Sequence, residues 1–163
     1  METQRRFAVM GDNAFKVANK LIQNQKICRL LKYPVRDPLS PEREDVDGYD
    51  LIHKQIIITP KLYDGSAEKM SYIVFVFDGF RVNQLNTEYK LATLRFDIAC
   101  PYDEWVLDDN SLRPYVIMQE IDNMFNQAKL SGIGNLEFVR AVPLTLSPQL
   151  GGYSMEYKTN EFN

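Results

Sequence analysis

Three side chains of this 163-residue sequence are of types that often act as nucleophiles or bases: His53, Cys28 and Cys100. A Cys–His pair would supply a thiolate and its base, and the sequence leaves a pairing of His53 with either cysteine open. Neither cysteine stands in a nucleophile motif, and the two lack the close spacing of a CxxC pair. Both fall on apolar stretches, where buried thiols are normally inert. We therefore expect unreactive cysteines and no catalytic residue.

A second pattern, D…ExK, has the residue types of a metal site. Asp78, Glu88 and Lys90 follow the order in which restriction-type nucleases hold Mg²⁺ with two carboxylates and place a lysine beside the attacking water. The ExK tripeptide recurs at 156–158, and the Asp-Gly pair at 78–79 equally favours a turn. With 19 basic against 22 acidic residues, the chain lacks the basic surface that a DNA-cutting enzyme needs. A small Mg-dependent nuclease is therefore the alternative function, and we expect Glu88 and Lys90 at a strand start facing solvent.

An acidic segment, residues 100–110 (CPYDEWVLDDN), gathers four acidic residues around Trp105, among them Asp108 and Asp109. Such a cluster has the chemistry to bind a cation or to line an acidic surface. Like charges also crowd ordinary loops, so we expect a solvated loop whose tryptophan packs on the core. The glycines at 132–135 follow a predicted helix instead of preceding one, which argues against a phosphate-binding loop. We expect neither a metal nor a cofactor.

Residues 34–50 (PVRDPLSPEREDVDGYD) form the second acidic segment. They contain three prolines, one glycine and six acidic against two basic residues, a local charge of −6 + 2 = −4. This composition predicts a loop. Loops of such length are uncommon inside compact domains and are often functional or ordered only on binding. Two interpretations stay open: a solvated surface excursion, or an arm that docks on a neighbouring subunit.

Apolar periodicity predicts two helices before this loop. Asp12 can cap the first, whose apolar face repeats at helical spacing over residues 14–22. A short second helix carries apolar residues over 27–31, and Pro34 makes continuation past Tyr33 unfavourable. The chain therefore enters the loop directly from a helix.

Three strands are predicted after the loop. A β-branched run at 56–59 comes first, followed by a DGS turn at 64–66. Residues 72–77 are apolar on both faces of a strand, which indicates burial on both sides. After a turn over 78–87, residues 91–100 alternate, so their even-numbered side chains should face the core and the odd-numbered ones a wetter surface.

A long helix is the clearest element of the second half. Asn110 or Ser111 can cap it, and Pro114 fits its first turn. Its apolar stripe consists of Ile117, Ile121, Met124, Phe125 and Ala128. We expect the helix to end at Gly132, its stripe to pack on the core face of the 91–100 strand, and Glu120 to face solvent.

Residues 136–146 and 153–157 are predicted as the last two strands, joined by SPQLGG. The order α-β-β-β-α-β-β favours an α+β fold, a mainly antiparallel sheet with helices packed on one face, because strands are grouped on both sides of one helix. The length fits one domain over residues 1–163. The longest apolar run, 72–77, is too short to span a bilayer, and the start of the sequence lacks a signal-peptide core, so we expect a reducing, intracellular site of synthesis.

Four segments carry a resemblance to small neck and tail-completion proteins of tailed bacteriophages: YIVFVFDGF, LRFDIACPYDEWVLDDNSLRPYVIMQEIDNMFN, GIGNLEFV and GGYSMEY. With the element order over residues 12–158, the chain is similar to the tail terminator and related head-tail joining proteins. The resemblance implies a virion structural protein, assembled in the host cytoplasm, that forms a homo-oligomeric ring, commonly a hexamer, on the end of the tail tube. It implies the tail tube protein and the head connector as partners, with DNA only passing through the lumen.

The resemblance brings no catalytic residue with it. Residues 35–50 are longer than a minimal version of this fold requires, so the choice between a terminator and another neck component stays open. A non-viral adaptor domain of the same topology is a further alternative.

A ring of this kind needs exposed apolar or extended surface on each subunit. We select candidate interface residues from the strand that is apolar on both faces and from the two acidic segments. They are Tyr72, Val74, Val76, Pro38, Leu39, Tyr49, Trp105, Asp108 and Asp109. We expect the ring to close through heterologous contacts in which sheet edges or the 34–50 arm of one subunit meet the next subunit.

Overall fold

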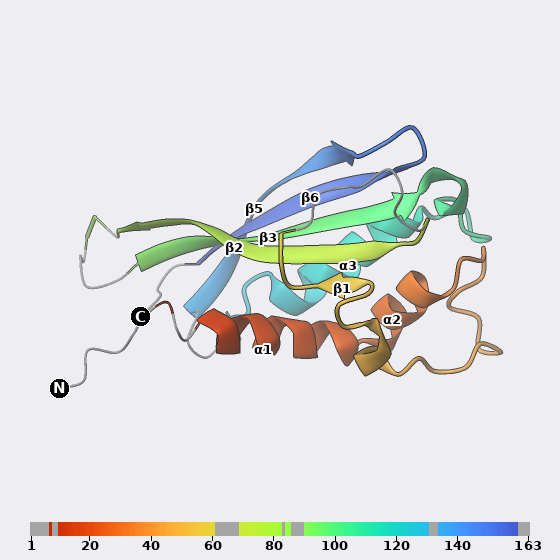
Figure 1. Cartoon of the computed structure of the whole chain (residues 1–163), viewed down its shortest axis with the longest axis horizontal. Helices are drawn as coiled ribbons and strands as arrows, with labels where there is room; N and C mark the ends of the chain where they lie inside the picture. Colours follow the sequence, from red (N-terminus) through yellow and green to blue (C-terminus); the bar gives the residue numbers. More distant parts are fainter. Residues whose placement is uncertain are drawn as a thin grey trace.

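The computed structural model describes residues 7, 10–60, 69–82, 84–85, 90–130 and 134–159. Figure 1 shows how the helices and strands of this part of the chain are arranged. Their bounds are α1 Met10–Ile22, α2 Gln25–Lys32, β1 Ile56–Ile57, β2 Tyr72–Val82, β3 Lys90–Pro101, α3 Arg113–Phe125, β4 Lys129–Leu130, β5 Gly134–Thr145 and β6 Leu150–Thr159. Two short 3₁₀ helices span Gly48–Leu51 and Tyr102–Glu104.

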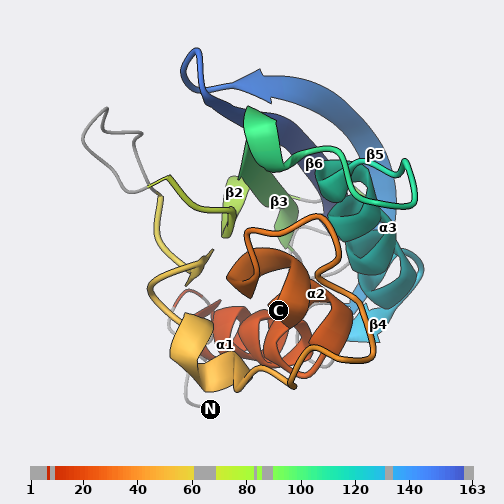
Figure 2. The ribbon, with the colours of Figure 1, turned by 90° about the vertical axis from the view of Figure 1, so that its right-hand side faces the viewer.

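The strands form one sheet in the spatial order β1-β2-β3-β6-β5-β4. β1 runs parallel to β2, and the other neighbouring pairs are antiparallel. The sheet curls around α1, α2 and α3, which all lie on one of its faces (Figures 1 and 2). We call the opposite face, on which no described helix lies, the bare face. The predicted α+β fold and its element order are confirmed, with α2 as the short second helix and β4 as a two-residue addition.

The core between sheet and helices follows from the alternation of β3. Its even-numbered side chains from 92 to 100 are buried, and its odd-numbered side chains from 91 to 97 are half-buried on the bare face. Ile121 of α3 is buried in the same apolar cluster as the core face of β3. The ring of Phe96 lies 5.0 Å from that of Phe125, at the end of α3. The predicted packing of the helix stripe on this strand is confirmed.

Both helices before the loop lie where the periodicity placed them. α1 buries Val17, Ala18, Leu21 and Ile22, the predicted face. It begins at Met10, so Asp12 lies inside its first turn and the predicted cap at Asp12 is wrong. α2 is capped by the Asn24 side chain and ends before Tyr33, because Pro34 disfavours further helix.

β2 begins as predicted, with burial on both faces. Ile73 and Phe75 belong to the core under the helices. Tyr72 and Val74, on the bare face, are only 4% and 5% exposed because they pack in a second apolar cluster. β1 pairs with this stretch but contains only Ile56–Ile57 of the predicted 56–59 run. The predicted DGS turn at 64–66 lies outside the described residues.

The turn predicted over 78–87 is wrong in its first part, because β2 continues to Val82 and pairs with β3 along that length. The ladder contains a bulge after Asp78. There Gly79 adopts a φ of +62°, a conformation that glycine reaches at little cost. The Asp-Gly pair therefore marks a bulge inside a long strand.

The start of α3 differs from the prediction. The N-cap residue is Leu112, which makes no side-chain cap hydrogen bond, so Asn110 and Ser111 precede the helix without capping it. A loop carbonyl replaces the cap: the Arg113 N–H donates to the Trp105 oxygen at 2.7 Å. Because an early helical N–H already has this acceptor, no capping side chain is needed there.

The end of α3 also differs. The helix stops at Phe125, and the Asn126 side chain accepts the Phe138 N–H at 3.2 Å, which fixes the chain reversal into β4 and β5. Ala128 therefore lies beyond the helix, and the predicted stop at Gly132 falls outside the described residues. β6 begins at Leu150, so its glycines belong to the strand and not to the turn that precedes it.

Glu120 does not face open solvent, as was predicted. Its carboxylate accepts a hydrogen bond from the Asn24 amide at 3.0 Å and lies 3.5 Å from the Lys26 ammonium. Its side chain is only 16% exposed. It therefore links α3 to the start of α2, a contact that helical spacing alone does not show.

Candidate functional site

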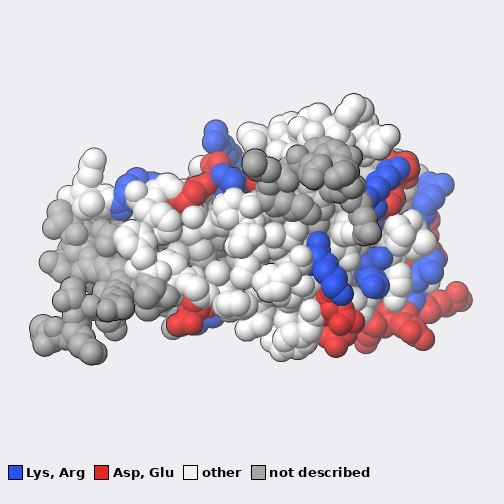
Figure 3. Space-filling model, in the orientation of Figure 1, with Lys and Arg blue, Asp and Glu red and all other residues white. Residues whose placement is uncertain are grey.

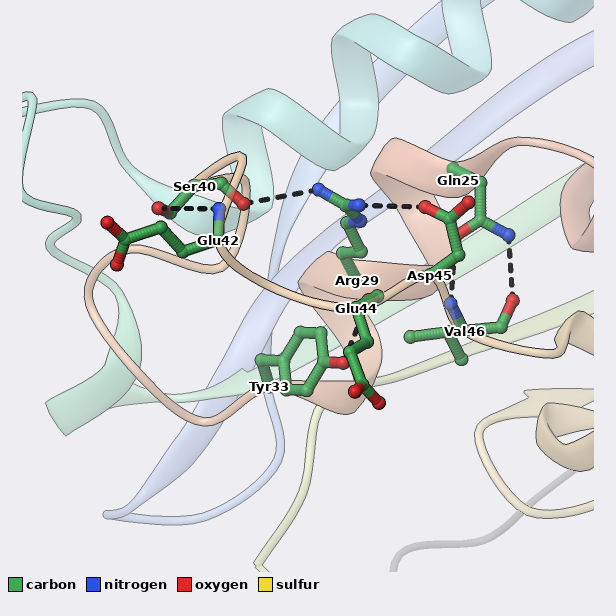
Figure 4. Close-up of polar contacts among 8 residues, drawn as sticks. All are labelled: Gln25, Arg29, Tyr33, Ser40, Glu42, Glu44, Asp45 and Val46. Carbon is green, nitrogen blue, oxygen red and sulfur yellow. Dashed lines mark hydrogen bonds and ion pairs between the residues drawn. The ribbon is translucent and has the colours of Figure 1, made fainter.

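The 34–50 segment is folded onto α2 (Figure 4). Gln25, in the first turn of α2, forms a closed amide pair with Val46: its side-chain nitrogen donates to the Val46 carbonyl at 2.7 Å and its oxygen accepts the Val46 N–H at 2.9 Å. Residues spaced by four along a helix share one face, so Arg29 and Tyr33 continue this contact line. The side of α2 facing the segment thus offers one polar anchor per turn.

The next two anchors hold the middle of the segment. Arg29 donates to the Ser40 carbonyl at 3.3 Å and to the Asp45 carboxylate at 2.7 Å. The Tyr33 hydroxyl donates to the Glu44 carbonyl at 2.9 Å. In this conformation the segment belongs to the surface of its own subunit, which favours the surface-excursion interpretation. The loop was predicted to extend to residue 50, but from residue 48 the chain forms the 3₁₀ helix Gly48–Leu51.

The segment also has an internal link. Arg43 lies 2.5 Å from the Asp37 carboxylate, and its guanidinium carbon lies 5.7 Å from the centre of the Tyr33 ring. The hydrogen bond from Arg43 lowers the pKa of Asp37. One basic side chain therefore neutralises part of the acidic segment and stacks it on the end of α2.

Arg113, the first residue of α3, is the polar centre beneath this surface. Its side chain is fully buried, and its guanidinium donates to three backbone carbonyls, those of Leu30, Val35 (2.5 Å) and Glu104 (2.9 Å). Burial lowers the pKa of Arg113, but the guanidinium stays protonated at ordinary pH. Three separate segments are thereby fixed to α3: the last turn of α2, the start of the loop and the 3₁₀ helix Tyr102–Glu104.

A groove opens where the two acidic segments meet, and we call it the loop groove. Its volume is about 260 Å³, and it is lined by Arg36, Asp37, Pro38, Leu39, Ser40, Leu107, Asp108, Asp109, Ser111 and Val116. The Asp108 N–H donates to the Arg36 carbonyl at 2.9 Å, which joins its two walls. The Ser111 hydroxyl donates to Asp109 at 2.5 Å and lowers the pKa of that carboxyl. Four of the nine candidate interface residues, from segments 70 positions apart, thus lie around one groove.

The other candidate residues lie elsewhere. Tyr49 is 73% exposed on the 3₁₀ helix that ends the loop. The Trp105 indole donates to the Cys100 carbonyl at 3.0 Å and packs against the core, as the loop interpretation predicted. Tyr72 and Val74 are already covered within the subunit. Val76 is half-buried on the same strand.

The two cysteines, the potential nucleophiles, are both buried. Burial raises the pKa of Cys28 to about 11 and that of Cys100 to about 12, and both thiols are free and buried. His53, the potential base, is exposed and therefore does not share the buried surroundings of the two thiols. Their side chains therefore have the inert character that the sequence predicted.

The D…ExK residues are only partly described. Asp78 is paired with Arg95 at 2.6 Å inside the β2–β3 ladder, on the bare face. Glu88 lies outside the described residues, and Lys90 is placed only as the first residue of β3. Among the residues the structure describes, no three histidine, cysteine or acidic side chains come together in a way that could hold a metal ion.

Charge is distributed unevenly over the molecule. On the bare face, opposite charges pair across neighbouring strands: Arg95 with Asp78, Arg140 with Glu156 at 2.9 Å, and Lys158 with Glu137 at 2.9 Å. Acidic side chains gather instead at the end of the molecule where the 34–50 segment lies (Figure 3, right). The bare face is nearly neutral, and the acidic excess belongs to the end that carries the loop groove.

At each of the two outer edges of the sheet, part of a strand has no partner strand in the described part of the chain. β4 pairs only with the first two residues of β5, and the next stretch, to Phe138, bonds to residues 126–128. From Val139 to Thr145, β5 pairs with β6 on its inner edge, and no described strand lies beside its outer edge. On the other side, β1 pairs only with Ile73 and Val74, so β2 continues to Val82 without a described neighbour on its outer edge.

A comparison with known protein families finds a match to most of the chain. The family model YomW matches residues 24–159, that is, α2 and everything after it up to the last residue of β6. No curated protein matches the chain. None of the described helices combines the length and the apolar character needed to cross a membrane.

Proposed function

This chain belongs to the YomW family, and from that membership we propose that it is a structural protein of a bacteriophage neck or tail. The family name is phage-derived, which is consistent with a phage origin. Within that class we propose a tail terminator, a ring of identical subunits that ends the tail tube and joins it to the head connector. The protein would assemble in the host cytoplasm and remain in the virion.

The observation that carries this proposal is the pair of open strand edges on opposite sides of one sheet. An exposed edge is a template for pairing with another chain, and soluble proteins normally cover or shorten such edges. Two different edges on one subunit allow head-to-tail contacts, which close into a ring when the rotation between subunits divides a full turn. Residues 139–145 of β5 and the outer part of β2 supply these two edges.

The loop groove supports a second kind of contact, to the tail tube or the head connector. It lies at the acidic end of the subunit, and its walls are held by the α2 anchors and by Arg113. A rigid polar surface of this type can bind a partner without the cost of ordering a flexible arm. We therefore assign Pro38, Leu39, Asp108 and Asp109 to contacts with another component along the tail axis.

DNA would only pass through such a ring. The net charge of the chain is −3, and the bare face is balanced by cross-strand pairs, so neither offers the excess of basic groups that holds a phosphate backbone. A neutral or acidic lumen lets DNA slide because it makes few lasting phosphate contacts. The proposal includes no catalytic step and no cofactor.

The proposal is tested by the mass and shape of the purified protein. Light scattering across a concentration series should give a closed oligomer, with six subunits of 18.9 kDa as the expected number, and negative-stain electron microscopy should show rings. Adding purified tail tubes should place density at one tube end. A protein that stays monomeric at high concentration, both alone and with tail tubes, would contradict the proposal.

A further inference from the structure

An apolar groove lies beside the free edge of β5, on the helix-bearing side of the sheet; we call it the α3–β5 groove. Its volume is about 300 Å³, and its lining combines side chains of α3 with those of β5 and β6: Tyr115, Met118, Gln119, Asp122, Asn126, Phe138, Ala141 and Met155. Asp122 is occupied by a hydrogen bond from the Tyr157 hydroxyl at 2.7 Å. Phe138 and Tyr115 remain 44% and 46% exposed. The floor is thus apolar and open to solvent.

The edge of β5 beside this groove is closed at one end and open at the other. Near the start of β5, Leu136 donates to the Ala128 carbonyl at 3.0 Å, and Phe138 donates to Asn126. Beyond Phe138 the edge is available for pairing in the described part of the chain. The charged side chain of Arg140, which would discourage a second strand, is already held on the bare face by Glu156 in a two-pronged contact of 2.9 and 3.1 Å. The structure therefore leaves this stretch open to an incoming strand.

The outer part of β2 has the complementary character. Residues opposite each other in an antiparallel ladder place their side chains on the same face. Val82 pairs with Lys90, whose parity in β3 is that of the core-facing Leu94, so Val82 lies on the helix-bearing side. Val82 is 55% exposed, whereas the ring of Phe80, close to it, packs edge-on against that of Phe7 at 5.4 Å. This arm of β2 carries apolar surface on the same side of the sheet as the α3–β5 groove.

We propose that the outer β2 arm of a second copy of this chain pairs along the free edge of β5 and places Val82 in the α3–β5 groove. This inference rests on the proposed self-assembly and names the contact that produces it. The strand pairing supplies backbone hydrogen bonds, and the groove supplies the pocket that selects the side chains. The β2 arm and the α3–β5 groove are different surfaces, so each subunit can use both at once. Such contacts give a chain of subunits that closes into a ring.

The lengths of the two edges agree. The free part of β5 comprises residues 139–145, and the outer part of β2 comprises residues 75–82. At about 3.3 Å per residue, both stretches are roughly 20–25 Å long. Pro143 has no N–H to donate, so it removes at most one hydrogen bond from the new ladder. The contact also covers Phe138, an exposed aromatic residue of the kind that contributes most at interfaces.

The test uses Val82→Lys, which changes an exposed arm residue and should leave the fold intact. The matched control is Val142→Lys: Val142 is 41% exposed and lies on β5, but it pairs with Ser154 on the bare face. A second variant, Phe138→Lys, blocks the groove while leaving the arm unchanged, and circular dichroism checks its folding. The mass of each protein is measured by light scattering.

Val82→Lys should reduce the mass from that of the oligomer to that of the monomer, and Val142→Lys should leave the oligomer unchanged. Mixing Val82→Lys with Phe138→Lys should give a one-to-one dimer and nothing larger, because only one intact groove and one intact arm can meet. A Val82→Lys protein that still forms the wild-type oligomer overturns the inference while leaving the ring proposal standing. A wild-type protein that is monomeric under all conditions overturns both.

Discussion

Replacement of Arg113 by methionine offers the sharpest test of how the candidate site is held together. Methionine replaces the aliphatic stem of the buried side chain but removes the guanidinium and all of its donors. The three carbonyls that now accept from the guanidinium lose their partners, and they belong to three different segments. The expected consequence is a loss of global stability together with a loosening of the loop surface.

The magnitude follows from opposing contributions. A hydrogen bond from a charged donor contributes about 1.5–3 kcal/mol, and a buried acceptor left without a partner costs about 1–3 kcal/mol. Removing the guanidinium also removes its desolvation cost of several kcal/mol, which acts in the opposite direction. The Leu30 carbonyl is in the buried contact, whereas the contacts to Val35 and Glu104 are only partly buried and can recover water. We expect a net loss of about 3–5 kcal/mol, comparable to breaking a buried ion pair.

Urea unfolding measures the global effect, since a change in midpoint at constant slope reports stability alone. Limited trypsin digestion measures the local effect, because Arg36 and Arg43 lie in the segment that Arg113 ties down. Arg113→Met should speed cleavage at both sites, and Arg113→Lys should restore only part of the stability because an ammonium lacks the planar fork of donors. A stability loss below about 1 kcal/mol with unchanged cleavage would refute the assigned role.

Further predictions concern the core, the thiols and catalysis. Ile121→Ala should lower the free energy of unfolding by about 2–5 kcal/mol, because it leaves a cavity in the core. Gln119→Ala, on the exposed side of the same helix, should change it by no more than about 0.5 kcal/mol. Similar urea midpoints for the two variants would mean that the helix register is wrong. Burial holds the pKa of Cys28 and Cys100 above that of an unfolded thiol, so the unfolded state releases protons first and stability should fall as pH rises from about 9 toward 11–12. At pH 8 neither thiol should react with a thiol reagent until denaturant is added, and native-state labelling would contradict their burial. Purified protein with DNA and Mg²⁺ should leave the DNA uncut, and cleavage lost on alanine substitution of the ExK residues would instead favour the nuclease.

The alternation of β3 and the stripe of α3 were readable from sequence because they are local. A strand places every second side chain on the same face, and a helix every third or fourth, so the spacing of apolar residues already indicates the buried faces. The core positions of both elements, including Ile121 and Phe96, were therefore predicted correctly. The boundaries failed where a distant group satisfied the backbone, as the Trp105 carbonyl does at the start of α3.

The candidate site depended on contacts that no local pattern contains. Sequence marked residues 34–50 and 100–110 as acidic loops, but not that they would meet around one groove. Arg113 and the carbonyl of Leu30 are 83 positions apart, and Glu120 reaches Asn24 across 96. The same holds for the free edges of β2 and β5, since an edge exists only once the order of strands in the sheet is set. Periodicity determines which side of an element is buried, but only the folded chain determines which groups satisfy its polar atoms and which surfaces stay open, because those depend on what distant segments bring alongside.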